Sequence, residues 1–381
     1  MKKLKAVLIG AGSRGTTYTD IMHTMPDKYE LVAVAEPIDS RRNYIKNKHG
    51  IKDELCFTDW NPLFAKGKIA DLAIIATMDA QHYDGTIKAI DLGYDILLEK
   101  PISPDPHECV EIARRAEQKG VKIVVCHVLR YAPLFTQLKD IIDSGKIGKV
   151  MSIDHVECVG NVHQSHSFVR GNWGNSKKSS PMLLQKSCHD MDILPWLVGK
   201  NCVKVQSFGT LSHFKQDNAP DGAPEYCIEG CPHGETCPYN AVKLYPDDKE
   251  NEWFRTTCTK EASPTDEDVE KAIRATQYGK CVYKCDNDVV DHQTVNLLFE
   301  DDITITFTMN AFNKGGRSIH IMGTKGEVHA ATDGDAPIEI YSFETKKTRQ
   351  IPMTGKDGIT GGHGGGDTHG TKRFSPTTKD F

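Results

Sequence analysis

The stretch LLEKPIS, residues 97–103, places Glu99 and Lys100 directly after an apolar run and ends that run with Pro101. A lysine in this setting can donate a hydrogen bond to a substrate oxygen on which negative charge develops. Pro101 disfavours the helical conformation for Lys100 and keeps the backbone there extended. An exposed strand end that serves only solubility has the same local sequence, so the surrounding elements decide between the two interpretations.

A second group of chemically capable side chains lies in LLQKSCHDMDIL, residues 183–194. On a helix, two sets with three- and four-residue spacing share overlapping faces: Lys186, His189 and Asp190, or Gln185, His189 and Asp192. Histidine can exchange a proton near neutral pH, which makes His189 a candidate general base. A helix with a polar, exposed side shows the same pattern.

Three glycines, Gly10, Gly12 and Gly15, stand in GAGSRG between the first apolar run and the first segment that is predicted to be helical. In a strand–turn–helix unit the first glycine permits a tight turn and the second lets the backbone approach a pyrophosphate. The third allows close packing of helix on strand. The N–H groups at the start of the helix, around Ser13 and Arg14, then face the phosphates. The spacing predicts a dinucleotide site; a tight turn in an unrelated α/β protein is the alternative.

Glu36 ends the second apolar run, 21 residues after Gly15. An acidic side chain at this place accepts hydrogen bonds from the ribose hydroxyls of an adenosine and repels a 2′-phosphate. NAD is therefore predicted as the cofactor. Arg41 and Arg42 lie nearby and can reach a 2′-phosphate, so NADP is the alternative.

The first 130 residues alternate between apolar runs and other segments, as expected for strands separated by helices. Strands are predicted at 4–10, 29–36, 70–77, 94–100 and 121–128, and helices at 15–25 and 107–120. Continuous apolar strands indicate a parallel sheet covered on both faces. Because ligands bind at the carboxyl ends of such strands, Thr77, Glu99 and Lys100 are expected at the cofactor, with Lys100 near the nicotinamide.

After about residue 150 the pattern changes to partial period-two alternation, which is typical of an antiparallel sheet with one exposed face. The segments concerned are 149–160, 289–300, 303–312 and 318–330. A helix is predicted at 186–198. A long polar region rich in Pro, Gly, Cys and charge lies at 217–280.

The length of 381 residues suits two domains, and 38% apolar with 26% charged residues is ordinary for a globular protein. A net charge of −5 argues against a nucleic-acid-binding surface. The N-terminal apolar run breaks at Gly10, short of a signal-peptide core, and no apolar stretch reaches the roughly 20 residues of a membrane span. These totals predict a cytoplasmic protein that binds neither nucleic acid nor membrane.

Twelve cysteines are many for that compartment. Cys227, Cys231 and Cys237 fall within eleven residues, and Cys281 and Cys285 follow further along the chain. Zinc held by three of these cysteines and a fourth ligand would staple a polar region that has little core of its own. An iron–sulfur cluster is a second hypothesis, although the spacing is not that of ferredoxins. Free or disulfide-linked cysteines are the third, since a double CxxC is absent.

The GAGSRG loop, the EKP strand end, His82 ahead of the run AIDLGYDILLEKP, and HVLRYAP after the fifth strand together resemble the Gfo/Idh/MocA oxidoreductases. The resemblance covers about residues 4–330 and is most specific in the first 135. It implies a Rossmann domain followed by an α/β domain with an open, largely antiparallel sheet. That sheet often makes the subunit contact, so a homodimer or homotetramer is expected. The resemblance also implies an NAD(P)-dependent dehydrogenase acting on CH–OH groups of sugars, cyclitols or related polyols.

The resemblance also implies roles for single residues. The EKP lysine of the family lies in the active site and corresponds to Lys100, and a helix histidine that exchanges the hydroxyl proton corresponds to His189. Many members carry an aspartate four residues before that histidine, where this chain has Gln185, so Lys186 or Asp192 is expected to replace it. Candidates for the substrate pocket are Arg130, Tyr131, Arg170, Asn172, Trp173 and Asp192.

The expected domains are 1–130 for dinucleotide binding and 131–360 for substrate binding and oligomerisation, with a Cys-rich insertion at 217–285 and an irregular tail at 361–381. The tail departs from the family, whose members usually continue into an apolar helix. Two other functions fit the same residues. One is a redox-neutral glycosidase or epimerase that regenerates tightly held NAD; the other is a non-catalytic nucleotide-binding sensor.

Overall fold

The computed structural model of the chain describes residues 3–332, 336–353 and 366–367. These fall into two compact units. Unit 1 contains the described residues up to Cys126 together with Ala241–Thr276, and unit 2 contains His127–Asn240 and the described residues from Gln277 onward. Part of the expected insertion thus groups with unit 1. The irregular tail expected at 361–381 lies outside the described residues, except for Gly366 and Asp367.

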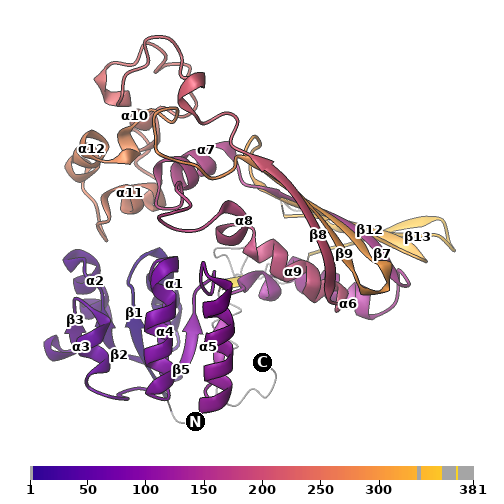
Figure 1. Cartoon of the computed structure of the whole chain (residues 1–381), viewed down its shortest axis with the longest axis horizontal. Helices are drawn as coiled ribbons and strands as arrows, with labels where there is room; N and C mark the ends of the chain where they lie inside the picture. The colour runs from indigo at the N-terminus through magenta and orange to yellow at the C-terminus, as the bar shows by residue number, and fades with distance from the viewer. Residues whose placement is uncertain (1–2, 333–335, 354–365, 368–381) are drawn as a thin grey trace. The chain divides into compact units, whose positions relative to one another are not determined.

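Unit 1 is built on a parallel sheet with the strand order β3-β2-β1-β4-β5-β6 (Figure 1). Its strands are β1 (Leu4–Ile9), β2 (Tyr29–Ala35), β3 (Cys56–Phe57), β4 (Leu72–Ile75), β5 (Asp95–Leu98) and β6 (Ile123–Val125). Every residue of β4 is buried, so both faces of the sheet are covered, as continuous apolar runs predict. An order that reverses between β1 and β4 is that of a Rossmann fold, which confirms the predicted fold class.

The helices of unit 1 follow the strands they connect. They are α1 (Ser13–His23), α2 (Asp39–His49), η1 (Asp53–Leu55), α3 (Trp60–Phe64), η2 (Asp79–Gln81), α4 (His82–Asp91) and α5 (Pro106–Lys119). The sequence at the start of α5 explains why this helix begins there. The Asp105 side chain accepts a hydrogen bond from His107 N at 2.8 Å, and Pro106 occupies the first turn. Gly120, with φ +65°, ends it.

The segment Ala241–Thr276 adds helices where the composition predicts only a polar region. They are α10 (Ala241–Leu244), α11 (Glu252–Thr259) and α12 (Asp266–Ala275). Helix α12 begins with a capping box, in which Asp268 N donates to Thr265 Oγ1 at 3.2 Å and Thr265 N donates to the Asp268 carboxylate at 3.0 Å. Val269, Ala272 and Ile273 are buried at helical spacing, so both signals for this helix are present in the sequence.

Unit 2 is built on an eight-stranded sheet, within the described residues, with the order β14-β13-β12-β11-β7-β10-β9-β8. Its strands are β7 (Val150–Cys158), β8 (Cys202–Thr210), β9 (His292–Phe299), β10 (Thr304–Asn310), β11 (Gly316–Gly323), β12 (Gly326–Ala331), β13 (Ile338–Ser342) and β14 (Lys347–Ile351). Strands β7 and β10 pair in parallel, and the other neighbours pair antiparallel. The largely antiparallel second sheet is therefore confirmed.

Helices cover one face of this sheet. The helical elements of unit 2 are η3 (Val128–Tyr131), α6 (Pro133–Asp143), α7 (Asn161–His163), the π-helix η4 (Gln164–Arg170), α8 (Met182–Gln185), α9 (Cys188–Val198), η5 (Gln216–Asn218), η6 (Cys227–Glu229), η7 (Gln277–Gly279) and η8 (Glu300–Asp302). Leu138 of α6, Leu197 of α9 and Phe307 of β10 are fully buried in one core. Burying each such side chain stabilises the fold by about 1.5–3 kcal/mol. The outward residues of β10, such as Thr304 and Thr306, are exposed.

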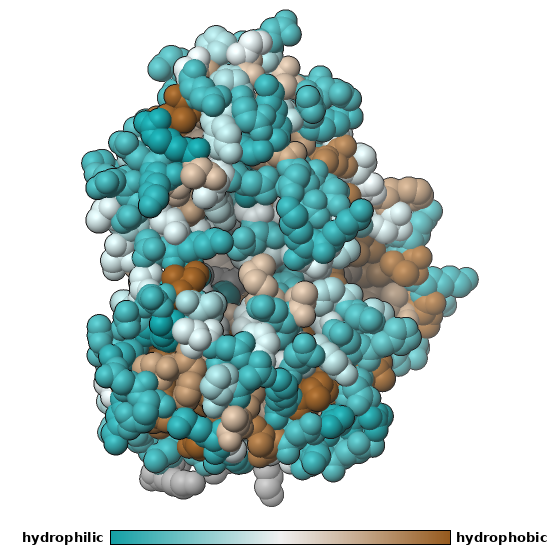
Figure 2. Space-filling model, turned by 60° about the vertical axis from the view of Figure 1, so that its left-hand side comes forward, coloured by the Kyte–Doolittle hydropathy of each residue, from teal (hydrophilic) through white to brown (hydrophobic). Residues whose placement is uncertain are grey.

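Among the described residues, no helix is long and apolar enough to cross a bilayer. The face shown in Figure 2 consists mainly of hydrophilic side chains, with small scattered hydrophobic patches. Large exposed apolar side chains include Val203, Val205 and Phe208 on β8, which lies at the edge of the second sheet.

Candidate functional site

The three glycines of the loop between β1 and α1 have different roles: two allow close packing within the protein, and one leaves backbone open to a ligand. Gly10 has φ +89°, and a Cβ there would lie 2.6 Å from Ala76 O. A Cβ at Gly15 would lie 2.0 Å from Gly10 O. At Gly12, however, the nearest atom would be Arg41 Nη1 at 3.7 Å, an ordinary contact. Packing therefore explains the first and third glycines, whereas the open backbone at Gly12 suits the approach of a ligand.

Glu36 is fixed beside this loop. It directly follows β2, is buried, and its carboxylate accepts hydrogen bonds from Ala11 N at 2.7 Å and Ile38 N at 3.0 Å. Arg42 Nη1 donates to the Glu36 backbone oxygen at 2.6 Å. The open backbone at Gly12, the N-terminus of α1 and this held carboxylate are the features that fit an NAD molecule.

A buried network ties the start of α1 to the end of β5. Arg14 Nε donates to Glu99 Oε1 at 2.8 Å, and the Tyr18 hydroxyl donates to the same oxygen at 2.5 Å. Lys100 N donates to the other carboxylate oxygen at 2.8 Å. Burial acts to raise the pKa of Glu99, but the charges of Arg14 and Lys100 outweigh it and hold that pKa below its usual value. Glu99 is thus an ionised anchor that fixes the backbone of Lys100.

Two further residues, His82 and Thr77, lie beside the segments that follow β4 and β5. The His82 ring has Nδ1 2.7 Å from Pro101 O and Nε2 3.2 Å from Thr77 O, so it joins the segments that follow β4 and β5. The Lys100–Pro101 peptide bond is cis. Thr77 Oγ1 is buried and has no hydrogen-bond partner in the part of the chain that the structure describes. The Thr77 hydroxyl is thus a buried group without a partner there, and its contact with a cofactor stays a prediction.

The candidate base His189 lies in the first turn of α9 and is only 2% exposed. Helix α8 ends at Gln185 and α9 begins at Cys188, so the segment read as one helix is interrupted at Lys186. The His189 ring meets the His127 ring edge to face, with the centroids 6.2 Å apart.

The residue after the candidate histidine, Asp190, anchors α9 to the sheet. Its carboxylate lies 2.7 Å from His155 Nε2 on β7 and accepts a hydrogen bond from Arg317 Nε on β11 at 2.8 Å. Arg317 also pairs with Glu157, which lies 3.4 Å from Lys186 Nζ. Burial acts to raise the pKa of Asp190, but Arg317 and His155 outweigh it and lower that pKa. A connected set of buried charges thus fixes the helix that carries the histidine.

The other predicted substrate residues of this region take different positions. Arg130 donates two hydrogen bonds to the Asp192 carboxylate, at 2.7 and 2.5 Å. Tyr131 is partly buried, and Asn172 is exposed. Trp173 is partly buried and packs against the core of unit 2. The structure pairs Arg130 with Asp192, and contact of these residues with a substrate stays a prediction.

Cys227, Cys231 and Cys237 line one cavity of about 170 Å³ together with Cys281, which their spacing alone does not reveal. Arg170, the last residue of the π-helix η4, lines the same cavity, is 1% exposed and donates from Nη2 to Cys227 Sγ at 3.7 Å. Arg170 is one of the predicted substrate residues, and the sequence did not indicate that it lies among the cysteines. Its role in substrate binding stays a prediction.

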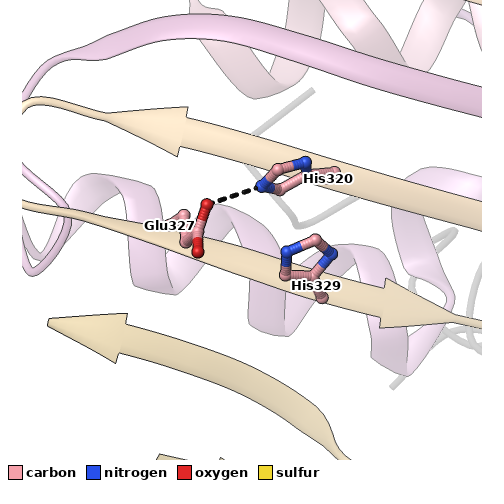
Figure 3. Close-up of side chains that lie close together, drawn as sticks. All are labelled: His320, Glu327 and His329. Carbon is pink, nitrogen blue, oxygen red and sulfur yellow. Dashed lines mark hydrogen bonds and ion pairs between the residues drawn. The ribbon is translucent and has the colours of Figure 1, made fainter. Parts of the chain in front are cut away.

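A second set of metal-ligating side chains lies on the hairpin of β11 and β12 (Figure 3). His320 Nε2 is 2.9 Å from Glu327 Oε2, and the rings of His320 and His329 stack with centroids 3.7 Å apart. His320 and His329 are direct cross-strand neighbours in the antiparallel register. Cross-strand pairing accounts for their contact, so the group needs no ion to explain it.

Comparison with known proteins agrees with this architecture. The model of the oxidoreductase family GFO_IDH_MocA, NAD-binding Rossmann fold, matches residues 4–127, and that of its C-terminal alpha/beta domain matches residues 139–360. A Bacillus subtilis protein named as an oxidoreductase, YteT, is 25% identical over 320 residues, 78% of this chain and 70% of that protein. An inositol 2-dehydrogenase of Corynebacterium glutamicum is 26% identical over 208 residues, and the match spans 54% of this chain and 57% of that enzyme.

Solved structures share the fold at low identity. An oxidoreductase domain protein from Kribbella flavida has a TM-score of 0.69 at 18% identity, with 97% of this chain and 88% of that chain covered. An Agrobacterium radiobacter oxidoreductase in complex with NAD+, L-tartaric acid and magnesium has a TM-score of 0.64 at 15% identity, with 97% and 85% covered. The chain therefore belongs to the Gfo/Idh/MocA family of oxidoreductases, with the NAD-binding Rossmann domain followed by the C-terminal alpha/beta domain of that family.

Proposed function

We propose that this protein is an NAD-dependent dehydrogenase that oxidises a CH–OH group of a sugar, cyclitol or related polyol. The observation that supports the proposal best is the held strand end, where Glu99 fixes the backbone of Lys100 through the same network that orders the start of α1. The likeness to an inositol 2-dehydrogenase supports the substrate class, and no more than that, because the match spans 57% of that enzyme.

The cofactor would be held by the glycine loop, by the N–H groups around Ser13 and Arg14, and by Glu36. Bound NAD supplies a hydride acceptor. Gly12→Ala tests this assignment: because a Cβ there makes only an ordinary contact, the fold should be retained while NADH affinity falls about tenfold or more. Equal NADH affinity in both proteins, measured by isothermal titration calorimetry, would contradict it. The same titration with NADPH tests the preference that Glu36 predicts.

Two side chains are proposed to act on the substrate. A ring nitrogen of His189 accepts the proton of the substrate hydroxyl, and Lys100 Nζ donates a hydrogen bond to a substrate oxygen on which charge develops. Lys186 is proposed to assist this proton transfer through its charge. The Lys186 ammonium forms an ion pair with Glu157, with Nζ 3.4 Å from the carboxylate.

The decisive assay supplies a panel of sugars, cyclitols and glycosides with NAD, and follows nicotinamide absorbance together with product analysis. Accumulating NADH that falls about a hundredfold or more in Lys100→Ala and His189→Ala would support the proposal. Lys119→Ala and His329→Ala, changes of the same types away from these residues, serve as controls. Product without net NADH would identify the redox-neutral cycle, and NADH binding without turnover of any compound would favour the sensor.

We further propose that the protein is a homodimer or homotetramer. The edge strand β8 exposes Val205 and Phe208 to about two thirds of their full extent, at 67% and 65%. Exposed apolar side chains on a sheet edge are suited to burial against another chain. Light scattering after gel filtration should give a multiple of the chain mass, reduced in Val205→Lys. A monomeric wild type would contradict this.

A further inference from the structure

Four cysteines from two chain segments converge on one cavity of unit 2. They are Cys227, Cys231, Cys237 and Cys281. An isolated antiparallel bridge between Tyr226 and Lys280 joins the two segments at the residues that directly precede the first and the last of these cysteines. The bridge explains how thiols more than forty residues apart in the chain come to line the same space.

In this structure no three of the four thiols are as close together as the ligands of a single metal ion. A tetrahedral zinc site with Zn–S bonds of about 2.3 Å holds its sulfur atoms about 3.8 Å apart. Among the described residues, His320, Glu327 and His329 form the one group whose three ligand atoms lie within 4.8 Å of one another, so no three of the thiols do. The cavity of about 170 Å³ is also many times the roughly 10–15 Å³ that one water requires. The spacing of the thiols and the volume of the cavity that they line suit a group of several atoms better than a single ion.

The surroundings of the thiols suit an anionic group ligated by sulfur. The buried Arg170 guanidinium donates a hydrogen bond to Cys227 Sγ at 3.7 Å and lines the same cavity as the other three thiols. Hydrogen bonds to cysteine sulfur and a nearby cation stabilise the negative charge of thiolate-bound clusters.

We propose that Cys227, Cys231, Cys237 and Cys281 bind a [4Fe–4S] cluster. Four thiolates are the ligand set of such a cluster, and its iron–sulfur cube separates them further than one ion does. The cluster would fasten two segments that carry short turns, η6 and η7, and would stabilise the fold by binding the folded state. This inference is independent of the proposed dehydrogenase activity.

Protein purified anaerobically from iron-replete cells tests the proposal without any variant. We expect about four irons and four inorganic sulfides per chain, and a broad visible absorption that bleaches with dithionite. One zinc per chain without iron would overturn the cluster in favour of a mononuclear site. Metal-free protein whose four thiols react with a thiol reagent in the absence of denaturant would overturn any metal site.

Variants then test the ligand assignment. Cys231→Ser and Cys281→Ser should each lose more than half of the bound iron. Cys285→Ser, a change of the same type four residues from Cys281 at a position outside the described cavity lining, should retain it. Because unfolding would also release iron, near-ultraviolet circular dichroism of each variant is compared with that of wild-type protein. Iron at the wild-type level in both Cys231→Ser and Cys281→Ser would overturn the assignment.

Discussion

The two candidate catalytic residues, one in each unit, share a structural feature: each is next to a buried acid that is paired with an arginine. Lys100 follows the buried acid Glu99, and His189 precedes the buried acid Asp190. Each acid binds an arginine that lies 85 or 127 residues away in the chain. Both acids are ionised in the folded protein, because the charges around them lower their pKa values against the effect of burial.

The partners of the two acids differ. Glu99 binds one arginine and the neutral hydroxyl of Tyr18. Asp190, by contrast, is fully buried and belongs to a set of charges that continues through Arg317 to Glu157. Loss of one member of a buried charge set leaves its neighbours uncompensated, whereas a neutral donor tolerates the loss better. The unit that carries His189 should therefore be the more sensitive of the two.

The largest effect is expected for Asp190→Asn. The amide removes one of the two buried carboxylates that pair with Arg317, so the free energy of unfolding should fall by about 3–5 kcal/mol. Asp192→Asn, the same change two residues away on α9, removes a pair whose arginine is 41% exposed and should cost less than about 1 kcal/mol. Urea unfolding measures both. Similar losses in the two variants would mean that burial of the charge set does not determine its importance.

A smaller loss is expected for Glu99→Gln. The amide oxygen can still accept hydrogen bonds from Arg14 and Tyr18, so the free energy of unfolding should fall by only about 2 kcal/mol. Glu111→Gln, which removes a surface pair with Arg114, is the control and should leave stability within experimental error. Hydrogen exchange followed by mass spectrometry should localise the loss to unit 1. A loss larger than that of Asp190→Asn would reverse the ranking of the two units.

The pH dependence of stability should also be steeper in unit 2. Burial and the charge of Arg170 lower the pKa of His166 to about 3. Because this value lies below the unfolded value of about 6.5, the stability linked to His166 is complete above pH 6.5 and is lost as the pH falls toward 3. We expect the free energy of unfolding to fall by about 2 kcal/mol between pH 6.5 and 4.5, and to depend less on pH in His166→Asn.

Unit 1 provides the comparison for this effect. Burial and the charge of the neighbouring His23 together lower the pKa of His49 to about 4, but this side chain is partly exposed. Its contribution over the same pH range should therefore be smaller. Hydrogen exchange at pH 6.5 and 4.5 resolves the two units, and an equal loss in both would contradict the prediction.

A smaller loss of stability than for Asp190→Asn or Glu99→Gln is expected for Lys186→Met. Glu157 keeps its pairing with Arg317, and the ion pair removed is long, at 3.4 Å, so the loss should be about 1 kcal/mol. Lys186 also tests catalysis. If its charge assists proton transfer, kcat should fall while KM stays near the wild-type value, and the pH profile of kcat should shift. An unchanged kcat profile would leave Lys186 with a structural role alone.

The fold followed from sequence wherever the pattern was local. The five strands predicted for the first domain were found, as were the two helices, because apolar runs, caps and glycines act within a few residues. Strand β8 was not predicted: it lies at a sheet edge with every residue exposed, so it lacks the contrast between buried and exposed positions that marks a strand.

The candidate site, like the fold, could be predicted from sequence only where its residues belong to a local motif. The glycine loop, Glu36 and Glu99 lie together in unit 1 as their motif spacing indicates. Arg317 was missed, and Cys281 was named among the cysteines without being singled out. Each meets its partners through a contact that joins distant parts of the chain. No local period marks such contacts, and a single sequence does not display them.

The position of β7 in the middle of the second sheet has a consequence for synthesis on the ribosome. Ser152 of β7 pairs with Thr304 of β10, and the other neighbour of β7, strand β11, emerges later still. At about 5–20 residues per second, β7 waits roughly 8–30 s with both edges unpaired. Open strand edges pair with whatever strand is offered. Newly made chains should therefore depend on a chaperone during this interval, and slower translation should lower the yield of folded protein.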